Sequence, residues 1–248
     1  MIETAILLSA GRGSRLLPLT AERPKCLIEF NGRSLIGWQI EMLARAGVRR
    51  IEVVTGFETD MVESHLAAIT DPRVEIATHF NPFFQVADNL GSCWIVRELM
   101  AEGDFLILNG DTLVSQAIAR RVLQDNDWPI AVTVDVKDAY DSDDMKVERT
   151  GERLVRIGKT LTAEQANAES IGFLAFRGEV VFDHVGLEAG DHLDPAHAGA
   201  REHLDLPADQ RPAVEFDQAF RTLGGERQQP AASPGAQQDG GFNHRRLR

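Results

Sequence analysis

Two glycines and several basic residues directly follow the first apolar run of the chain. The apolar run is TAILLSA at residues 4–10, and the next residues read GRGSRLLPLTAERPKCL, up to Leu27. Glycines let backbone N–H groups approach an anion closely, and they tolerate positive φ angles. Arg15 can offer paired hydrogen bonds to phosphate oxygens, and Lys25 adds a compact positive charge. The stretch therefore predicts a loop that binds phosphate groups.

The spacing of this loop differs from that of two common phosphate-binding motifs. The dinucleotide-binding fingerprint needs a third small residue three positions after Gly13, where this chain has Leu16. The Walker A loop ends in Gly-Lys-Ser or Gly-Lys-Thr, which the stretch lacks. A tight turn between solvated arginines is the alternative for Gly11 and Gly13. Their position directly after a buried strand favours ligand binding, because ligands of open α/β sheets lie beyond the carboxyl ends of the strands.

A carboxylate follows a second apolar run, DFLILNGD at residues 104–111. The carboxyl ends of parallel strands lie at the same end of a sheet, so Asp111 can reach a Mg²⁺ ion that is bound to phosphate. Mg²⁺ sites typically use one or two carboxylates together with phosphates and water. An aspartate in an ordinary turn is the alternative.

Strand-like and helix-like segments alternate through the first half of the chain. This alternation predicts a three-layer α/β/α, Rossmann-like fold with a mostly parallel sheet. Strands are expected at residues 4–10, 51–57, 74–80, 104–111 and 130–136, and helices at residues 35–47, 60–69, 90–103 and 115–124. A Thr-Gly turn inside residues 146–158 predicts a hairpin. Together with a strand at residues 170–176, this hairpin is expected to form a small antiparallel extension that flanks the sheet.

The composition is typical of a globular protein and argues against a nucleic-acid-binding surface. The formal net charge is −12 at pH 7, and 43% of the residues are hydrophobic. The start of the chain has neither a positive n-region nor an apolar segment long enough to cross a membrane. The two cysteines are too few for a disulfide framework. We expect a cytoplasmic protein that binds no nucleic acid and no membrane.

The string G-x-G-x-R-L-x-P-L-T at residues 11–20, followed by P-K-x-L at residues 24–27, resembles the signature of the nucleotidyltransferase superfamily, which activates sugar phosphates and related phosphorylated alcohols. The similarity runs from Met1 to about Leu223. It implies that the loop holds the triphosphate of CTP or another NTP, that Arg15, Lys25 and Asp111 are catalytic, and that Asp111 holds Mg²⁺. The residues implied to bind the nucleotide around the loop are Leu8, Ala10, Gly11, Gly13, Ser14 and Gly110.

Three later segments are similar to the cytidylyltransferases that act on phosphocholine and 2-aminoethylphosphonate. They lie at residues 81–94, 144–147 and 169–176. The resemblance implies that Asn89 and Ser92 seat the nucleotide, although Ser92 could instead cap the helix that follows. On the acceptor side it points to Lys146, Lys159, Glu169 and Gly172, with solvated surface charge as the alternative for each lysine. Gly158 stands where the family has a glutamate.

Residues 135–144, DVKDAYDSDD, form an acidic run around Tyr140. A hydrated loop is the first interpretation of such a run. The alternative is a site for the cationic head group of a small phosphorylated acceptor, where Tyr140 would add a cation–π contact.

The predicted reaction is attack by a phosphate or phosphonate oxygen of the acceptor on the α-phosphorus of the NTP, with pyrophosphate as the leaving group. A phosphate monoester is largely dianionic at pH 7, so the attack needs no general base. CTP with a small phosphorylated alcohol or phosphonate is the first choice of substrates. An NDP-sugar pyrophosphorylase that acts on a sugar 1-phosphate is the alternative.

The family supplies a second metal carboxylate late in its chain, where this sequence has no aspartate in a strand-like run. Asp217 precedes the expected position, and Asp239 lies in a segment rich in Gly, Gln and Pro. We expect residues 1–223 to form a nucleotidyltransferase domain that is C-terminally incomplete relative to the family, and residues 224–248 to be a disordered tail. A catalytically silent nucleotide-binding module or a truncated product is therefore a further alternative.

Overall fold

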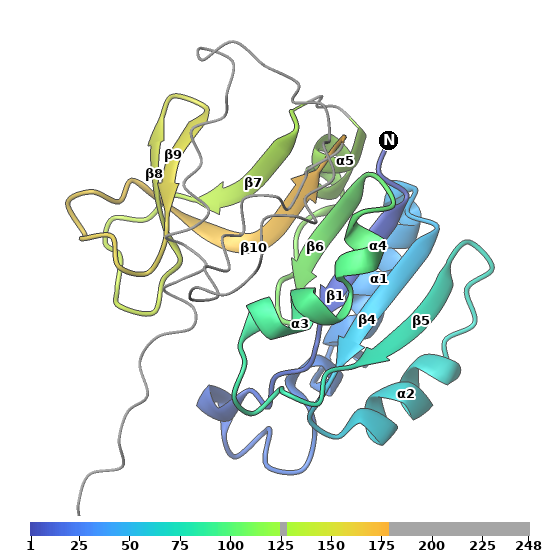
Figure 1. Cartoon of the computed structure of the whole chain (residues 1–248). Helices are drawn as coiled ribbons and strands as arrows, with labels where there is room; N and C mark the ends of the chain where they lie inside the picture. The colour runs from blue at the N-terminus through green and yellow to red at the C-terminus, as the bar shows by residue number, and fades with distance from the viewer. Residues whose placement is uncertain (125–127, 179–248) are drawn as a thin grey trace, which may run out of the picture.

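A sheet with helices on both faces forms the body of the protein (Figure 1). The computed structural model describes residues 1–124 and 128–178. The eight strands of the sheet lie in the order β5-β4-β1-β6-β10-β8-β9, with β7 paired to β10. The strands that pair in parallel are β1 (Thr4–Leu8), β4 (Arg50–Thr55), β5 (Glu75–Phe80) and β6 (Phe105–Asn109). The predicted three-layer α/β/α fold with a mostly parallel sheet is confirmed.

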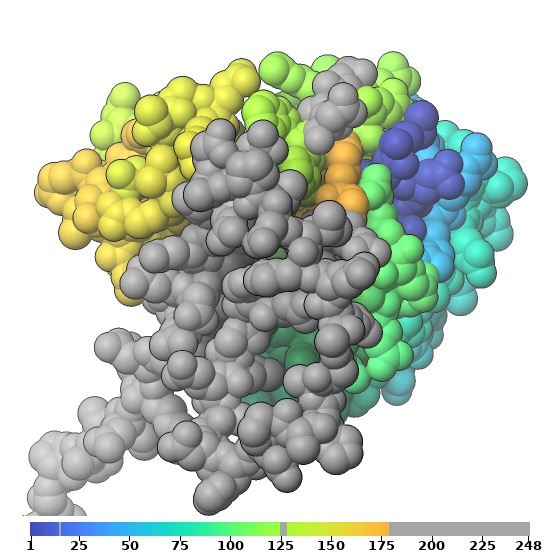
Figure 2. All heavy atoms as spheres, turned by 45° about the horizontal axis from the view of Figure 1, so that its top comes forward, coloured from blue at the N-terminus to red at the C-terminus, as the bar shows by residue number. Residues whose placement is uncertain are grey.

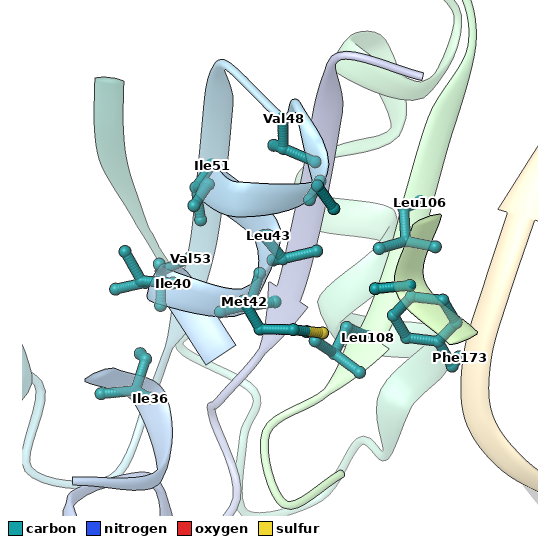
Figure 3. Close-up of a cluster of buried hydrophobic side chains, with 14 of the residues drawn as sticks. Ile36, Ile40, Met42, Leu43, Val48, Ile51, Val53, Leu106, Leu108 and Phe173 are labelled. Carbon is teal, nitrogen blue, oxygen red and sulfur yellow. The ribbon is translucent and has the colours of Figure 1, made fainter. Parts of the chain in front are cut away.

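Apolar side chains on both faces of β1 hold the layers together. Ala5 and Leu7 pack on one face, and Ile6 and Leu8 on the other, as the two-residue period of a strand requires. The first face is covered by α1 (Leu35–Ala46), α2 (Thr59–Ala67) and α5 (Gln116–Gln124), and the second by α3 (Asn89–Ile95) and α4 (Arg97–Met100). In Figure 3, side chains of α1 lie between those of β4 and those of β6 and β10.

The ends of the helices follow local sequence signals. The Ser34 hydroxyl accepts a hydrogen bond from the Gly37 amide at the start of α1, and Gly47 ends the helix with φ at 102°. The predicted helix over residues 90–103 is divided in two, because Val96 has φ at −106° between α3 and α4. Two short strands, β2 (Glu29–Phe30) and β3 (Arg33–Ser34), pair with each other before α1.

Strand β10 (Ala168–Phe176) lies inside the sheet, which corrects the expectation that it would flank the sheet. Its second half pairs antiparallel with β6, from Phe173 to Phe176. On the other side it pairs antiparallel with β7 (Ile130–Asp135). Because β10 reverses direction relative to both neighbours, β7 runs in the same direction as β6. No residue of β10 is fully exposed, which suits a central strand.

The predicted hairpin consists of β8 (Lys146–Thr150) and β9 (Arg153–Ile157), joined at Gly151, whose φ is 61°. Ala168 and Glu169 of β10 pair with the start of β8. In the space-filling view, the atoms of β8 and β9 (yellow) gather on one side of the molecule and those of the first strand (dark blue) on the other (Figure 2).

Several expectations fall on residues outside the described part of the chain. They concern Asp217, Asp239, the boundary between residues 223 and 224, and the tail over residues 224–248. Across the described residues, the structure contains no helix with the length and apolar character needed to cross a membrane.

Candidate active site

We call residues 11–27 the glycine loop; it follows the carboxyl end of β1 and folds back on itself. Gly13 has φ at 72°, and a Cβ atom there would lie 2.8 Å from the Cβ of Lys25. The Thr20 hydroxyl donates a hydrogen bond of 2.8 Å to the Gly13 carbonyl. Glycine is therefore required at position 13 by its backbone conformation and by the approach of the Lys25 side chain. The start of the loop at Gly13 thus contacts both its middle, at Thr20, and its end, at Lys25.

Lys25 and Asp111 form an ion pair across the site, although they are 86 residues apart in the chain. The Lys25 ammonium donates to Oδ2 of Asp111. The two side chains remain partly open to solvent, at 31% and 41% exposure. The structure thus brings together two residues that the sequence predicted separately, Lys25 as a catalytic lysine and Asp111 as a metal ligand. The Lys25 ammonium is therefore placed where it could contact a bound polyanion, and the Asp111 carboxylate where it could contact the cation that accompanies that polyanion.

The turn that carries Asp111 is fixed by contacts with β1 and α1. The Gly110 amide donates to the Leu8 carbonyl over 3.0 Å. A Cβ atom on Gly110 would lie only 2.8 Å from that carbonyl oxygen, so a larger residue does not fit. The Gln39 amide, which is fully buried, donates hydrogen bonds of 2.8 Å to the carbonyls of Asn109 and Thr112. These contacts determine where the Asp111 carboxylate can point.

Gln39 is a positioning residue that the sequence analysis missed. It occupies a buried position of α1, where the surrounding buried residues are apolar. A single amide within the apolar face of a helix is the signal that could have identified it, because a buried polar group needs hydrogen-bond partners.

Leu8, Ala10, Gly11 and Ser14 all lie at the carboxyl end of β1 or in the loop that follows it. Leu8 and Ala10 are buried, whereas Gly11 and Ser14 are exposed. Nothing lies within 4 Å of the position of a Cβ atom on Gly11, which leaves its backbone accessible to a ligand. Arg15 lies in a short 3₁₀ helix, Ser14–Leu16, and its side chain lies outside the described part of the structure.

Asn89 begins α3 beside the Asp111 turn, and its side-chain amide donates to Oδ1 of Asn109 over 3.1 Å. Ser92 is 3% exposed, and its hydroxyl accepts a hydrogen bond from Asn81. Ser92 does not cap the helix, because Asp88 is the N-cap and accepts from the Leu90 amide. The capping alternative for Ser92 is therefore wrong, while its role in seating a nucleotide stays a prediction.

The start of β8 and the turn after β6 lie next to each other along β10. We call this place, where residues 170–172 of β10 face both segments, the β6–β8 junction. The Ser170 amide donates to the Met145 carbonyl over 2.8 Å, and the Thr112 hydroxyl donates to the Ile171 carbonyl over 2.6 Å. The junction therefore places the residues of β8 and β10 that were predicted to bind the acceptor beside the turn that carries Asp111.

Gly172 permits this arrangement. Its φ is 74°, and a Cβ atom there would lie 2.1 Å from Nδ2 of Asn109. No L-amino acid with a side chain fits against Asn109 in that way. Gly172 thus allows β10 to pack against the Asp111 turn. The family resemblance pointed to Gly172 on the acceptor side, but it did not indicate this packing role.

The two lysines predicted to bind the acceptor lie at the open end of the hairpin, Lys146 at the start of β8 and Lys159 just after β9. Lys146 is 4% exposed, and its ammonium donates to the Lys159 carbonyl over 3.2 Å. The Lys159 ammonium lies 3.9 Å from the Asp143 carboxylate and remains partly exposed. Burial raises the pKa of Asp88, while the Leu90 amide and the positive charge of Lys159 act to lower it. Lys159 therefore lies near the start of α3, and Lys146 holds its backbone.

Glu169 and Asp144 share one cation, the ammonium of Lys137. The distance from the ammonium to Oδ2 of Asp144 is 3.0 Å, and Glu169 forms the second ion pair. Burial acts to raise the pKa of Asp144, but hydrogen bonds from the Asp141 amide and from Lys137 outweigh it and lower the pKa. Most carboxylates of the acidic run are exposed as a hydrated loop predicts, whereas Asp144 is buried.

The carboxylate of Asp111 fits a Mg²⁺ ion that is bound together with phosphates. Across residues 1–124 and 128–178, no group of three or more His, Cys, Asp or Glu side chains is arranged to hold a metal on its own. Mg²⁺ is commonly bound by one or two carboxylates and completes its octahedron with substrate phosphates and water. Asp111 offers hard oxygen ligands at the end of a strand, directly opposite the lysine of the glycine loop.

Comparison with protein families gives one match over more than half of the chain. The family model described as nucleotidyl transferase matches residues 4–143. The matched region contains the glycine loop, Lys25, the Asp111 turn and the start of α3, and it ends within the acidic run.

Individual relatives are similar over different lengths. The chain is 26% identical to the CTP:phosphoglutamine cytidylyltransferase of Campylobacter jejuni over 190 residues, which cover 69% of this chain and 72% of that protein. It is 33% identical to the N-acetylmuramate alpha-1-phosphate uridylyltransferase of Caulobacter vibrioides over 113 residues, which cover 44% of this chain and 46% of that protein.

Solved structures show the same fold. The inositol-1-phosphate CTP transferase from T. maritima aligns with a TM-score of 0.58 and 25% identity, over 71% of each chain. The UDP-glucose pyrophosphorylase from Acinetobacter baumanii aligns with a TM-score of 0.61 and 19% identity, over 71% of this chain and 75% of that one.

Proposed function

The chain belongs to the nucleotidyl transferase family, and we propose that it transfers CMP from CTP to a small phosphorylated alcohol or phosphonate with release of pyrophosphate. The observation that carries this proposal is the ion pair of Lys25 and Asp111 beside the glycine loop. The choice of CTP is supported by similarity to a cytidylyltransferase over 69% of the chain and to a CTP transferase at 25% identity.

The glycine loop and Lys25 would bind the triphosphate. Exposed backbone N–H groups around Gly11 can donate to phosphate oxygens, and the Lys25 ammonium can neutralise one of them. Binding of a triphosphate would transfer the Lys25 ammonium from Asp111 to the phosphates. That exchange leaves the Asp111 carboxylate to hold Mg²⁺, which when bound neutralises negative charge on the phosphates.

The acceptor would be positioned at the β6–β8 junction. Its phosphate oxygen attacks the α-phosphorus of CTP, a P–O bond forms, and the bond to pyrophosphate breaks. The acceptor phosphate is already dianionic near pH 7, so the protein has to position and neutralise it rather than remove a proton. Lys159, at the end of the hairpin and near the start of α3, is the cation we assign to this phosphate.

Two other functions make different predictions. A pyrophosphorylase for sugar 1-phosphates is favoured by the 33% identity with a uridylyltransferase, although that match covers 44% of the chain. A silent nucleotide-binding module is favoured by the metal site, because Asp111 is the one carboxylate that the described residues place opposite Lys25.

Pyrophosphate release from CTP, UTP and GTP, each combined with phosphocholine, 2-aminoethylphosphonate, inositol 1-phosphate and glucose 1-phosphate, tests the proposal. We expect turnover with CTP and a non-sugar acceptor. Faster turnover of UTP or GTP with glucose 1-phosphate would contradict it in favour of the pyrophosphorylase. Calorimetric binding of CTP with Mg²⁺ but no turnover of any pair would identify the silent module.

A further inference from the structure

Lys137 places a positive charge inside the acidic run, at the side of the β6–β8 junction. Its ammonium forms ion pairs with Asp144 and Glu169, so the two least exposed carboxylates of this region share one cation. Glu169 is opposite Asp135 of β7 on one side and Lys146 of β8 on the other. The cluster therefore joins Glu169 of β10 to Lys137 and Asp144, which lie in the loop between β7 and β8 beside the proposed acceptor site.

The backbone around Lys137 is folded so that the cluster is held in place. The Lys137 amide donates to the Tyr140 hydroxyl over 3.2 Å, and the Asp141 amide donates to Oδ2 of Asp144 over 3.0 Å. Hydrogen bonds to Glu169 and Asp144 raise the pKa of Lys137 above its ordinary value, so it stays positively charged at neutral pH. The Lys137 ammonium is thus held in the loop as a permanent positive charge.

A cavity of about 420 Å³ adjoins this loop, and its volume is large enough for a small head group. It is lined by Val136, Lys137, Asp138, Ala139, Tyr140, Ala163, Ala166 and Asn167. The Asn167 side chain is already bound at both ends, to the amide and the carbonyl of Arg149. An ammonium has three N–H donors, and Asp144 and Glu169 account for two of those of Lys137. A third N–H can donate to a ligand.

We propose that Lys137 determines the class of acceptor, and that the acceptor carries an uncharged head group with hydroxyl or amide oxygens. A quaternary ammonium head placed beside Lys137 would meet a positive charge, and the carboxylates of Asp144 and Glu169 next to it already pair with the Lys137 ammonium. A hydroxyl or amide oxygen can instead accept a hydrogen bond from Lys137. This inference rests on the proposed function, and it chooses against the cationic head group that the acidic run alone suggested.

Two acceptors whose head groups have the same shape but different charge distinguish the effect of head-group charge from that of head-group size. Phosphocholine carries a trimethylammonium group, and 3,3-dimethylbutyl phosphate replaces its nitrogen by carbon. We expect the wild-type protein to use dimethylbutyl phosphate and inositol 1-phosphate with a kcat/KM at least tenfold above that for phosphocholine. Lys137→Met should raise kcat/KM for phosphocholine at least tenfold, because a positive charge that lines the cavity is removed and the two carboxylates beside it lose their cation. A wild-type preference for phosphocholine would overturn the proposal whatever the variant does.

Two control variants test whether charge at this position is the cause. Lys137→Arg keeps the cation and should keep the wild-type order of acceptors. Arg73→Met removes a cation from the exposed ion pair with Asp71, away from the cluster, and should leave the order unchanged. If Lys137→Met does not fold, Lys137→Gln replaces it. Equal kcat/KM ratios in the wild-type and Lys137→Met or Lys137→Gln proteins would contradict the proposal.

A binding measurement separates this inference from the proposed function. Tyr140 is the single tyrosine of the chain and lines the cavity, so 3-fluorotyrosine gives one ¹⁹F resonance there. Titration with choline chloride should shift this resonance at a concentration at least tenfold lower in the Lys137→Met protein than in the wild-type protein. Choline titration curves that coincide would overturn the role of Lys137. An absence of turnover with every acceptor would instead contradict the proposed function, and the titration would still decide the role of Lys137.

Discussion

The nucleotide side and the acceptor side of the site are built from different kinds of contact. Around β1 and β6, positions are fixed by backbone approach, as at Gly110 against the Leu8 carbonyl and at Gly13 against Lys25. In the loops that flank β8 and β9, positions are held by charged side chains such as those of Lys137 and Lys159, which are partly exposed. The first kind tolerates almost no substitution, whereas the second can be changed by exchanging a single side chain.

The two sides therefore differ in how easily a substitution changes their function. A backbone approach leaves no room for another residue, so the geometry of the proposed triphosphate site is tied to the fold itself. Ion pairs at partly exposed positions contribute little to stability, and their exchange therefore alters ligand preference at small cost to folding. We infer that substrate choice is set mainly on the acceptor side.

Removing either partner of the central ion pair should have the largest effect. Lys25→Ala and Asp111→Asn should each lower kcat/KM for pyrophosphate release by about 10² to 10³-fold, because a charge that stabilises the transition state is lost. Asp111→Asn should also remove the dependence of the rate on Mg²⁺ concentration. Steady-state kinetics over a range of Mg²⁺ concentrations gives both results. Normal kinetics of Lys25→Ala would remove that residue from the phosphate site.

Gly172→Ala tests the contact that joins the two sides. The new Cβ atom would lie 2.1 Å from Nδ2 of Asn109, and φ is 74°, so the loss of unfolding free energy should be about 3 kcal/mol. Activity should fall as well, since Asn109 precedes the Asp111 turn. Gly151→Ala is the matched control, with φ at 61° and nothing within 4 Å of its Cβ atom. It should cost about 1 kcal/mol by urea unfolding and leave activity intact.

The two sides also differ in how far the sequence predicts them. The glycine loop, Lys25 and Asp111 follow from local strings, because each string lies at the end of an apolar strand. The pairing of Lys137 with Glu169 depends on β10 lying between β7 and β8, and a short apolar strand carries no information about its neighbours. For Gln39 the sequence offers the signal of an amide within an apolar helix face, but it does not identify the two carbonyl partners, which belong to a turn that is distant in the chain.

Replacing Lys159 should separate the two sides kinetically. Lys159→Ala should raise the KM for the acceptor about tenfold and leave the KM for CTP within about twofold, because the lysine faces the acceptor phosphate in the proposed arrangement. Arg153→Ala, at the opposite end of β9, is the control and should change neither constant. An equal rise of both KM values would show that the acceptor and nucleotide sites are not separate. Initial rates with one substrate varied at a time measure both constants.

The smallest effect concerns the rigidity of the nucleotide side, which its two cysteines can report. Burial raises the pKa of Cys26 to about 11 and that of Cys93 to about 12. The raised pKa keeps each thiol neutral at pH 8, with a thiolate fraction for Cys26 of about 0.1%, compared with about a quarter for an ordinary cysteine.

Iodoacetamide should therefore label neither thiol in the native protein at pH 8 on the time in which urea-unfolded protein reacts fully. Cys26 directly follows Lys25, and Cys93 lies on α3, so the two thiols probe opposite parts of the nucleotide side. Mass spectrometry of the labelled peptides distinguishes them. Rapid labelling of Cys26 but not of Cys93 would mean that the glycine loop opens in solution, and backbone approach would then fix only the part of the site that β6 and α3 carry.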